Sequence, residues 1–399
     1  MKANKFHTNA RVRLKCIKFH INIKEFHTNS IKFHTNLAKT QNVQKTIAQY
    51  HPICYDFINT SREGGVLIQI NRKIPESYYN LIRLKHRLPI SHKKYNDIVD
   101  EINITKAGYH GETRTDYFIQ EVEFPQDVHI IPDFHIKLHN NRYIQIDTLI
   151  ITKSYILIVE VKNIKGTIIF KDYPRQIVRV LNEKTRSFKC PVVQLERNLD
   201  GIEKWLTNNN WNLPIYTALV FASETTIVEN APTDQKIFFA KDFPLYIQKL
   251  NNLNPALSQK QFQQLTKELI QTNNNFIEMP LCRKYNIDTN ELKSGVLCKS
   301  CGDKLFRINQ RKWTCQSCGQ EDTNPIANNL EDFFVLMKNE ITMVECLRLL
   351  ELESRFTLNY TFQKMQLIKT GKGKSTIYRK NPSKHTSSTK PSSSSTETP

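Results

Sequence analysis

Three charged residues interrupt the most apolar part of this sequence, and their types suit metal-assisted hydrolysis. Asp147, Glu160 and Lys162 lie in the β-branched run 143–166. Two carboxylates held together repel one another unless a proton or a divalent cation lies between them, and oxygen ligands suit Mg²⁺. A neighbouring lysine can orient an attacking water and stabilise a phosphate that gains charge. The three residues are therefore candidates for phosphodiester chemistry.

The pattern around these residues predicts two antiparallel strands that are buried on both faces and joined by a turn at 152–154. Because side chains alternate along a strand, Glu160 and Lys162 lie on one face. That face also carries Ile156 and Ile158, and the opposite face carries Leu157, Val159 and Val161. The alternative is a half-buried Glu160–Lys162 ion pair with Asp147 in a loop, which has no catalytic role.

Cysteine spacing identifies a second chemical site. Two Cys-x-x-Cys pairs are each followed by glycine, and residues 305–308 and 312–314 between them predict a hairpin that brings the pairs together. Four thiolates leave no open position on Zn²⁺, so we predict one structural zinc ion. Its ligands are Cys298, Cys301, Cys315 and Cys318.

Composition favours a polyanionic partner. The 399 residues include 57 Lys and Arg against 38 Asp and Glu, a formal charge of +19. Solubility or an A+T-rich genome would also explain this excess. No segment approaches the roughly 20 apolar residues that span a bilayer, and the start offers no signal peptide. We therefore expect a cytoplasmic protein without a membrane partner, whose cysteines are metal ligands or buried thiols.

The first 65 residues differ from the rest. The unit KFHTN and close variants recur within residues 1–40, with one apolar position in seven, which is too few to close a helical seam, so we predict disorder. No Met lies between Met1 and Met279, and residues 62–65 (REGG) are what a purine-rich, bacterial-type ribosome-binding sequence would spell. We expect residues 1–65 to be a misannotated or non-native leader. A genuine basic arm is the alternative.

Helical periodicity marks residues 66–105 as an N-terminal helical segment. Gly108 and Gly111 then predict a break before a new helix that begins near Glu112, where the first turn favours a negative charge. After the hairpin, a strand is predicted at 167–170. A further hairpin, a helix and a strand follow, at 176–190, 192–206 and 215–221.

The order of these elements and residues resembles the nuclease-related domain (NERD) family, a branch of the PD-(D/E)xK nuclease-like fold. The resemblance is carried by Gly111-Glu112, Gln145-Ile146-Asp147, Glu160-Val161-Lys162-Asn163 and Gly166. It implies a mixed α/β protein with a restriction-endonuclease-like αβββαβ core at 106–240. A helical connection is expected at 241–290.

The resemblance also implies roles for individual residues. Asp147 and Glu160 would ligate Mg²⁺ or Mn²⁺ with the carbonyl of Val161, while Lys162 positions the water. Glu112 would support a second ion or its water. Gln194 occupies the place of a polar helix residue near the site, although a surface residue is equally expected there. Thr148 departs from the pattern, because many relatives have a histidine at this position.

The two cysteine pairs and the hairpin between them form the expected zinc ribbon, at 295–322. Beyond it, residues 328–380 resemble a winged helix, with three helices and a basic β-hairpin. A bare three-helix packing module is the alternative. The tail 381–399 is rich in Ser, Thr, Pro and Lys and is predicted to be disordered. Nucleic-acid contacts are predicted at Arg355, Asn359, Gln363, Lys364, Lys369, Lys372, Lys374 and Arg379.

The sequence therefore predicts a metal-dependent nuclease acting on DNA, with the zinc ribbon and the winged-helix-like segment as delivery modules. The alternative is a nucleic-acid-binding or regulatory protein whose nuclease-like domain does not cut. The survival of Glu112, Asp147, Glu160 and Lys162 together favours the enzyme.

Overall fold

The structure is a computed structural model that describes residues 69–125, 127–138, 142–273, 279–309 and 312–381. All of them belong to Arg62–Pro399, one of the two units into which the chain divides. The expected leader, residues 1–65, and residues 382–399 of the expected tail lie outside the described residues.

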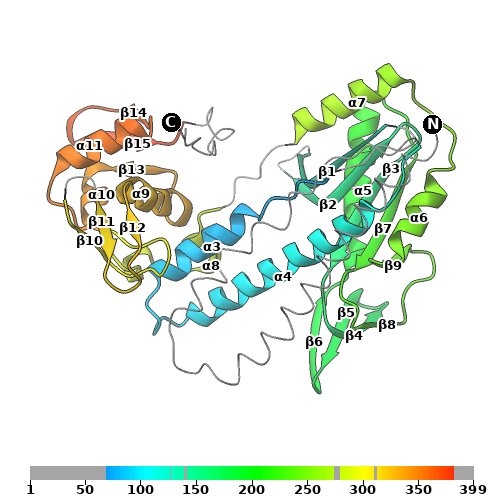
Figure 1. Cartoon of the computed structure of the whole chain (residues 1–399), viewed down its shortest axis with the longest axis horizontal. Coiled ribbons are helices and arrows are strands. Elements are labelled where there is room, and N and C mark those ends of the chain that lie inside the picture. The colour runs from blue at the N-terminus through cyan, green and yellow to red at the C-terminus, as the bar shows by residue number, and fades with distance from the viewer. Residues whose placement is uncertain (1–68, 126, 139–141, 274–278, 310–311, 382–399) are drawn as a thin grey trace, which may run out of the picture. The chain divides into compact units, whose positions relative to one another are not determined.

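A five-stranded sheet with the order β1-β2-β3-β7-β9 positions the charged residues (Figure 1). Strands β1, β2 and β3 are antiparallel, whereas β3, β7 and β9 are parallel. The strands are Val128–Lys137 (β1), Tyr143–Thr152 (β2), Ile156–Lys162 (β3), Ile215–Phe221 (β7) and Ile237–Phe239 (β9). With a helix before β1 and another before β7, the sheet follows the αβββαβ order, but its three antiparallel strands are β1, β2 and β3 and do not include the strand predicted at 167–170.

Helices cover both faces of this sheet, which explains why β2 and β3 are apolar throughout (Figure 1). One face packs against α5 (Pro191–Asn208) and α7 (Gln259–Thr272), and the other against α4 (Tyr95–Ile119) and α6 (Phe243–Leu250). Along β3, Ile156 and Ile158 enter the first core, while Leu157, Val159 and Val161 enter the second. The predicted alternation is confirmed.

A second sheet has the order β6-β5-β4-β8. The strand predicted at 167–170 is present, but it pairs in this second sheet because both edges of β3 are already taken by β2 and β7. The predicted hairpin after it is β5 and β6. The strands are Gly166–Lys171 (β4), Gln176–Leu181 (β5), Lys184–Lys189 (β6) and Thr226–Glu229 (β8).

Helix α4 corrects one prediction. It runs without a break from Tyr95 to Ile119, so Gly108 and Gly111 lie inside it and Glu112 is far from its first turn. The expected helix start near Glu112 and its dipole argument are wrong. Gly111 serves close packing instead, since a Cβ there would lie 2.5 Å from that of Asn163. This close approach offsets the roughly 1 kcal/mol that glycine costs within a helix.

The C-terminal region combines the zinc-ribbon strands with three helices around one hydrophobic cluster. Strands β10, β11 and β12 form one small sheet, and β13, β15 and β14 form another in that order. The predicted Thr342–Glu345 capping box is present at the start of α10. The elements are Leu305–Arg307 (β10), Trp313–Cys315 (β11), Glu321–Asp322 (β12), Pro325–Leu336 (α9), Glu340–Thr342 (β13), Met343–Leu350 (α10), Arg355–Lys364 (α11), Ile368–Thr370 (β14) and Ile377–Arg379 (β15).

Helix α3 (Glu76–Arg87) belongs to a cluster that also contains α8 (Leu281–Tyr285) and Leu336 of α9. Its last residue, Arg87, is only 1% exposed. Arg87 donates to Asp332 at 2.9 Å and to the carbonyls of Lys293 and Gly295 at 3.0 and 2.9 Å. A buried arginine with these partners ties α3 to the start of the ribbon.

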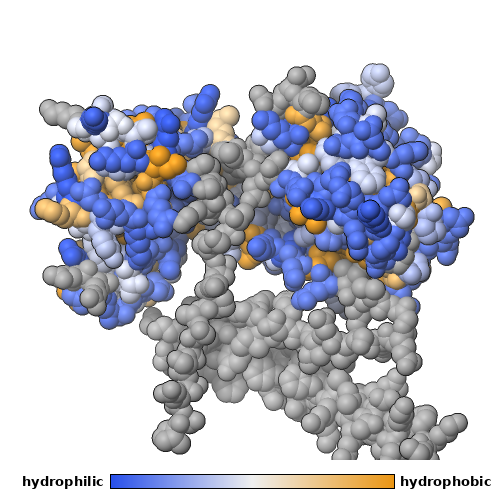
Figure 2. Space-filling view, turned by 90° about the horizontal axis from the view of Figure 1, so that it is seen from above, coloured by the Kyte–Doolittle hydropathy of each residue, from blue (hydrophilic) through white to orange (hydrophobic). Residues whose placement is uncertain are grey.

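The face drawn in Figure 2 is mainly hydrophilic where it is coloured, with small separate apolar patches. The large apolar side chains of the described residues lie mostly in the internal clusters. Within the described part of the chain, no helix has the length and apolar character needed to cross a bilayer.

Candidate functional site

The register of β2 and β3 brings two carboxylates together. Thr148 pairs with Val159 at the end of the ladder, and continuing this register by one residue places Asp147 opposite Glu160. The backbone ladder between the two strands ends here. The Asp147 side chain makes the next bond to β3, because its Oδ2 accepts a hydrogen bond from the Val161 N–H at 2.7 Å. Asp147 is 8% exposed and Glu160 is fully buried.

Lys162 is the partner of the buried Glu160. Its Nζ donates to Glu160 Oε1 in a short contact, and its side chain is 25% exposed. The other oxygen, Glu160 Oε2, is buried and has no hydrogen-bond partner among the described residues. An unsatisfied buried acceptor is costly, so this oxygen marks a place where the site is incomplete.

A second pair of acids comes from α4. Glu112 and Asp116 are both held by Arg72, whose side chain is 3% exposed. Arg72 donates from Nη1 to Glu112 at 2.7 Å and from Nε to Asp116 at 2.6 Å. Its Nη2 donates to Asp116 at 3.0 Å and to Thr148 Oγ1 at 2.6 Å. Thr148 therefore accepts a hydrogen bond from an arginine.

The electrostatics of the site show a deficit of positive charge. Burial and the charge of Asp147 raise the pKa of Glu160 to about 8, against the effect of Lys162. Burial and Asp147 also raise the pKa of Glu112 to about 7, against the effect of Arg72. Burial likewise raises the pKa of Asp147. Burial alone would lower the pKa of Lys162, but Glu160 and Asp147 raise it above its ordinary value.

A divalent cation would supply the positive charge that these carboxylates lack. Asp147 and Glu160 offer carboxylate oxygens, the ligands that Mg²⁺ and Mn²⁺ prefer, and Glu160 Oε2 is an acceptor without a partner. The carbonyl of Val161 remains a predicted third ligand, since the contact made here is that of its N–H with Asp147. These residues could hold one ion beside Lys162.

Comparison with known families matches residues 107–222 to NERD, the nuclease-related domain. The chain contains a nuclease-related domain. The match covers α4 from residue 107 through β7, and thus includes every carboxylate described above. No curated protein and no solved structure matches the chain.

The NERD domain brings together most of the residues predicted for its site. Asp147, Glu160, Lys162 and Glu112 interact electrostatically with one another. Gln194 is exposed in the first turn of α5, and no hydrogen bond of a described residue joins it to this group. Its predicted role therefore stays a prediction.

Arg72 and Asp116 belong to the NERD site but were missed from the sequence. Arg72 lies in an extended segment outside the matched residues, and its partners are 40 to 76 positions away along the chain. No local spacing marks such a pairing. The available signal was Asp116 itself, four residues after Glu112 and hence on the same face of the helix.

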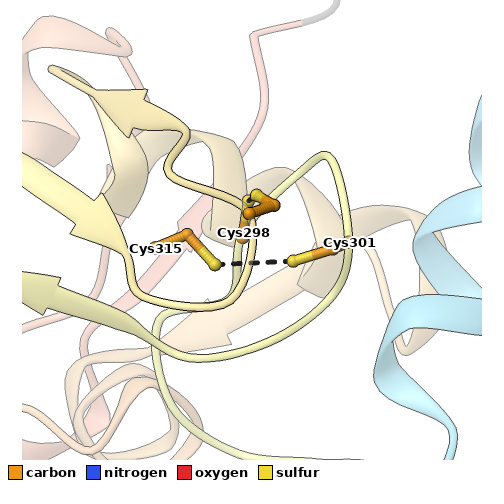
Figure 3. Close-up of side chains that lie close together, drawn as sticks. Cys298, Cys301 and Cys315 are labelled. Carbon is orange, nitrogen blue, oxygen red and sulfur yellow. Dashed lines mark hydrogen bonds between the residues drawn. The ribbon is translucent and has the colours of Figure 1, made fainter. Parts of the chain in front are cut away.

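The four predicted zinc ligands form a cluster, of which Figure 3 shows Cys298, Cys301 and Cys315. Their sulfur atoms all lie within 4.8 Å of one another, with Cys301 and Cys315 at 3.4 Å and Cys298 and Cys318 at 3.7 Å. A tetrahedral ion with Zn–S bonds of about 2.3 Å requires sulfur separations of about 3.8 Å. The glycines that follow the two pairs have positive φ angles of 78° and 70°, as predicted. The cluster fits a closed, structural Zn²⁺.

Most of the residues predicted to contact nucleic acid are exposed. On α11, exposed Phe356 and Tyr360 accompany the predicted polar positions. Arg379 is exposed too, but it donates to Glu340 at 2.6 Å within the small sheet. The exposed predicted residues are Arg355, Asn359, Gln363, Lys364, Lys369, Lys372 and Arg379, and the side chain of Lys374 lies outside the described residues.

Proposed function

We propose that this protein is a divalent-metal-dependent nuclease that hydrolyses phosphodiester bonds in DNA. The observation that carries the proposal is Glu160, a fully buried carboxylate beside Asp147 with one oxygen on Lys162 and the other without a partner among the described residues. In a purely structural ion pair, both oxygens of a fully buried carboxylate usually have hydrogen-bond partners. The arrangement suits a site that binds a cation during its work.

The proposed roles follow from geometry and charge. Asp147 and Glu160, with the Val161 carbonyl, would hold Mg²⁺ or Mn²⁺, which when bound supplies Lewis acidity. Asp147 is fixed for this by the Val161 N–H. Lys162, partly exposed at the edge of the site, orients the attacking water and stabilises charge that develops on the phosphate.

The C-terminal module supports DNA as the substrate class. A recognition helix enters the major groove with one exposed face, and a hairpin beside it contacts phosphates. Helix α11 offers an exposed face with Arg355, Asn359 and Gln363, and the hairpin of β14 and β15 carries exposed Lys369 and Lys372. We assign DNA delivery to this module.

Cleavage of labelled duplex, single-stranded and branched DNA, with RNA for comparison, tests the proposal. We expect cleavage with Mg²⁺ or Mn²⁺ and none with EDTA. Replacing Lys162 by Ala should lower the cleavage rate by about 10²–10⁴, because no second ammonium of the described residues pairs with Glu160 to orient the water.

Lys165→Ala is the matched control, since Lys165 is exposed and lies three residues further along the chain. It should cut like the parent. Equal cleavage by Lys162→Ala and the parent would refute the catalytic assignment. The competing function, DNA binding without cleavage, is favoured by the exposed face of α11, and it would be supported if the parent binds DNA but cuts none of the substrates.

A further inference from the structure

Arg72 reaches the NERD site from a segment that precedes the family match. In this extended segment Ile70 and Arg72 are partly buried, while Gln69, Asn71 and Lys73 are exposed. Such alternation places Ile70 and Arg72 on the same side of the chain. Ile70 packs against the core that contains Val159 and Val161, so the segment is anchored where Arg72 enters the site.

The contacts of Arg72 define what it can do. A guanidinium group has five N–H donors. Four of them are used, by Glu112, Thr148 and both oxygens of Asp116. Only one Nη1 hydrogen remains, so Arg72 cannot make the two parallel hydrogen bonds that arginine uses to bind a phosphate. Arg72 is a positioning residue and a fixed positive charge.

The charges of the site balance around this arginine. Glu112, Asp116 and Glu160 have side chains that are 20%, 4% and 0% exposed, and Asp147 is 8% exposed. Against these four carboxylates stand two cations, Arg72 and Lys162, which leaves two negative charges when all the acids are ionised. One divalent ion neutralises this remainder. Asp133 lies further out, with 45% of its side chain exposed to screening water.

We propose that Arg72 takes the place of a second metal ion, so that this nuclease site binds a single divalent cation between Asp147 and Glu160. The inference rests on the proposed metal-dependent function. It assigns Glu112 and Asp116 to Arg72 instead of to an ion. Neither acid is then free to act as a metal ligand while the guanidinium group holds both.

Counting bound Mn²⁺ by electron paramagnetic resonance tests this assignment without any reference to cleavage. The full chain is first brought to one Zn²⁺, which Mn²⁺ does not displace from thiolates because it binds them more weakly. We expect one Mn²⁺ per parent chain. Arg72→Gln should bind two, because it leaves Glu112 and Asp116 unpaired and the site with three net negative charges.

Two further variants keep the test decisive. Arg72→Gln combined with Glu112→Gln restores the original charge and should return to one Mn²⁺. If Arg72→Gln does not fold, Arg72→Lys takes its place and should bind one, because it keeps the positive charge. Arg175→Gln is the control, since Arg175 also makes two hydrogen bonds to an acid, Glu196, but at the surface. It should bind one.

The outcomes separate this inference from the proposed function. Two Mn²⁺ in the parent, one in Arg72→Gln with unchanged affinity, or two in Arg72→Lys would each overturn the role of Arg72 and leave the nuclease proposal standing. No Mn²⁺ in the parent would overturn the metal site itself, and the proposed function with it.

Discussion

The carboxylate cluster and the cysteine cluster are held together in opposite ways. Asp147 and Glu160 stand on strands of ten and seven residues between two large apolar cores, Glu112 and Asp116 stand on α4, and each of these acids already has a cation or an N–H as partner. Of the four cysteines, Cys315 alone lies on a strand, which is three residues long, and Cys301 and Cys318 are exposed. The first site is built before a metal arrives, whereas the second depends on its metal.

This difference follows from the sizes of the parts. Long, doubly covered strands gain enough apolar burial to hold charges in place, at a cost that Arg72 and Lys162 reduce. Strands as short as β10 to β12 are not stable alone in water. Under the proposed function, one metal serves chemistry and the other serves folding, and three predictions test that contrast.

Removal of zinc should have the largest effect on stability. Structural Zn²⁺ contributes about 10–16 kcal/mol of binding free energy in small zinc modules, so chelation or fourfold Cys→Ser replacement should unfold the ribbon. Hydrogen exchange should then show protection lost over 296–322 but retained over β2 and β3. Loss of protection in both regions would show that the two parts fold as one unit.

Substitution of Arg87 should have the second-largest effect on stability. Arg87→Met removes a buried cation from Asp332 and two carbonyls, which should lower the free energy of unfolding of the C-terminal module by about 3–5 kcal/mol. Denaturant unfolding at saturating zinc measures this.

Arg83→Met is the matched control, because Arg83 binds the same Asp332 from a side chain that is 34% exposed. Its loss should cost less than about 1 kcal/mol. A similar loss in both variants would mean that Asp332, and not the burial of Arg87, determines the effect.

The smallest effect should come from neutralising the lysines of the β14–β15 hairpin, which should change DNA binding alone. Replacing Lys369, Lys372 and Lys374 by Gln should weaken DNA binding and reduce the slope of log affinity against log salt by about 0.9 for each lost phosphate contact. Cleavage at saturating DNA should persist, because the carboxylate site is unchanged. Filter binding at several salt concentrations measures the slope.

The control for the hairpin removes the same number of charges from helices α6 and α7. Lys249, Lys260 and Lys267 are exposed there, and their replacement by Gln should leave the slope unchanged. Equal slopes for the two triple variants would place the DNA contacts elsewhere.

Local pattern was enough to predict β2, β3 and the cysteine ribbon. Their signals, β-branched alternation and Cys-x-x-Cys spacing, depend on neighbours in sequence. The pairing of Glu160 with Lys162 followed from the same alternation.

The features that the sequence did not predict depend on contacts between residues that are far apart in the chain. Gly111 was read as a helix breaker because its close approach to Asn163 cannot be seen along the chain. The pairing of Arg72 with Asp116 spans 44 positions, and an isolated arginine in an extended segment carries no periodic signal. The position of Gln194 was inferred from resemblance, and no contact of a described residue tests it.

The continuity of α4 has a practical consequence for anyone who isolates the nuclease-related domain. The family match begins at residue 107, inside a helix that starts at Tyr95, and a fragment cut there also loses Arg72. Such a fragment would expose a severed helix end and leave Glu112 and Asp116 without their counterion. A unit suitable for expression therefore begins before Ile70, well upstream of the boundary that the family match alone would suggest.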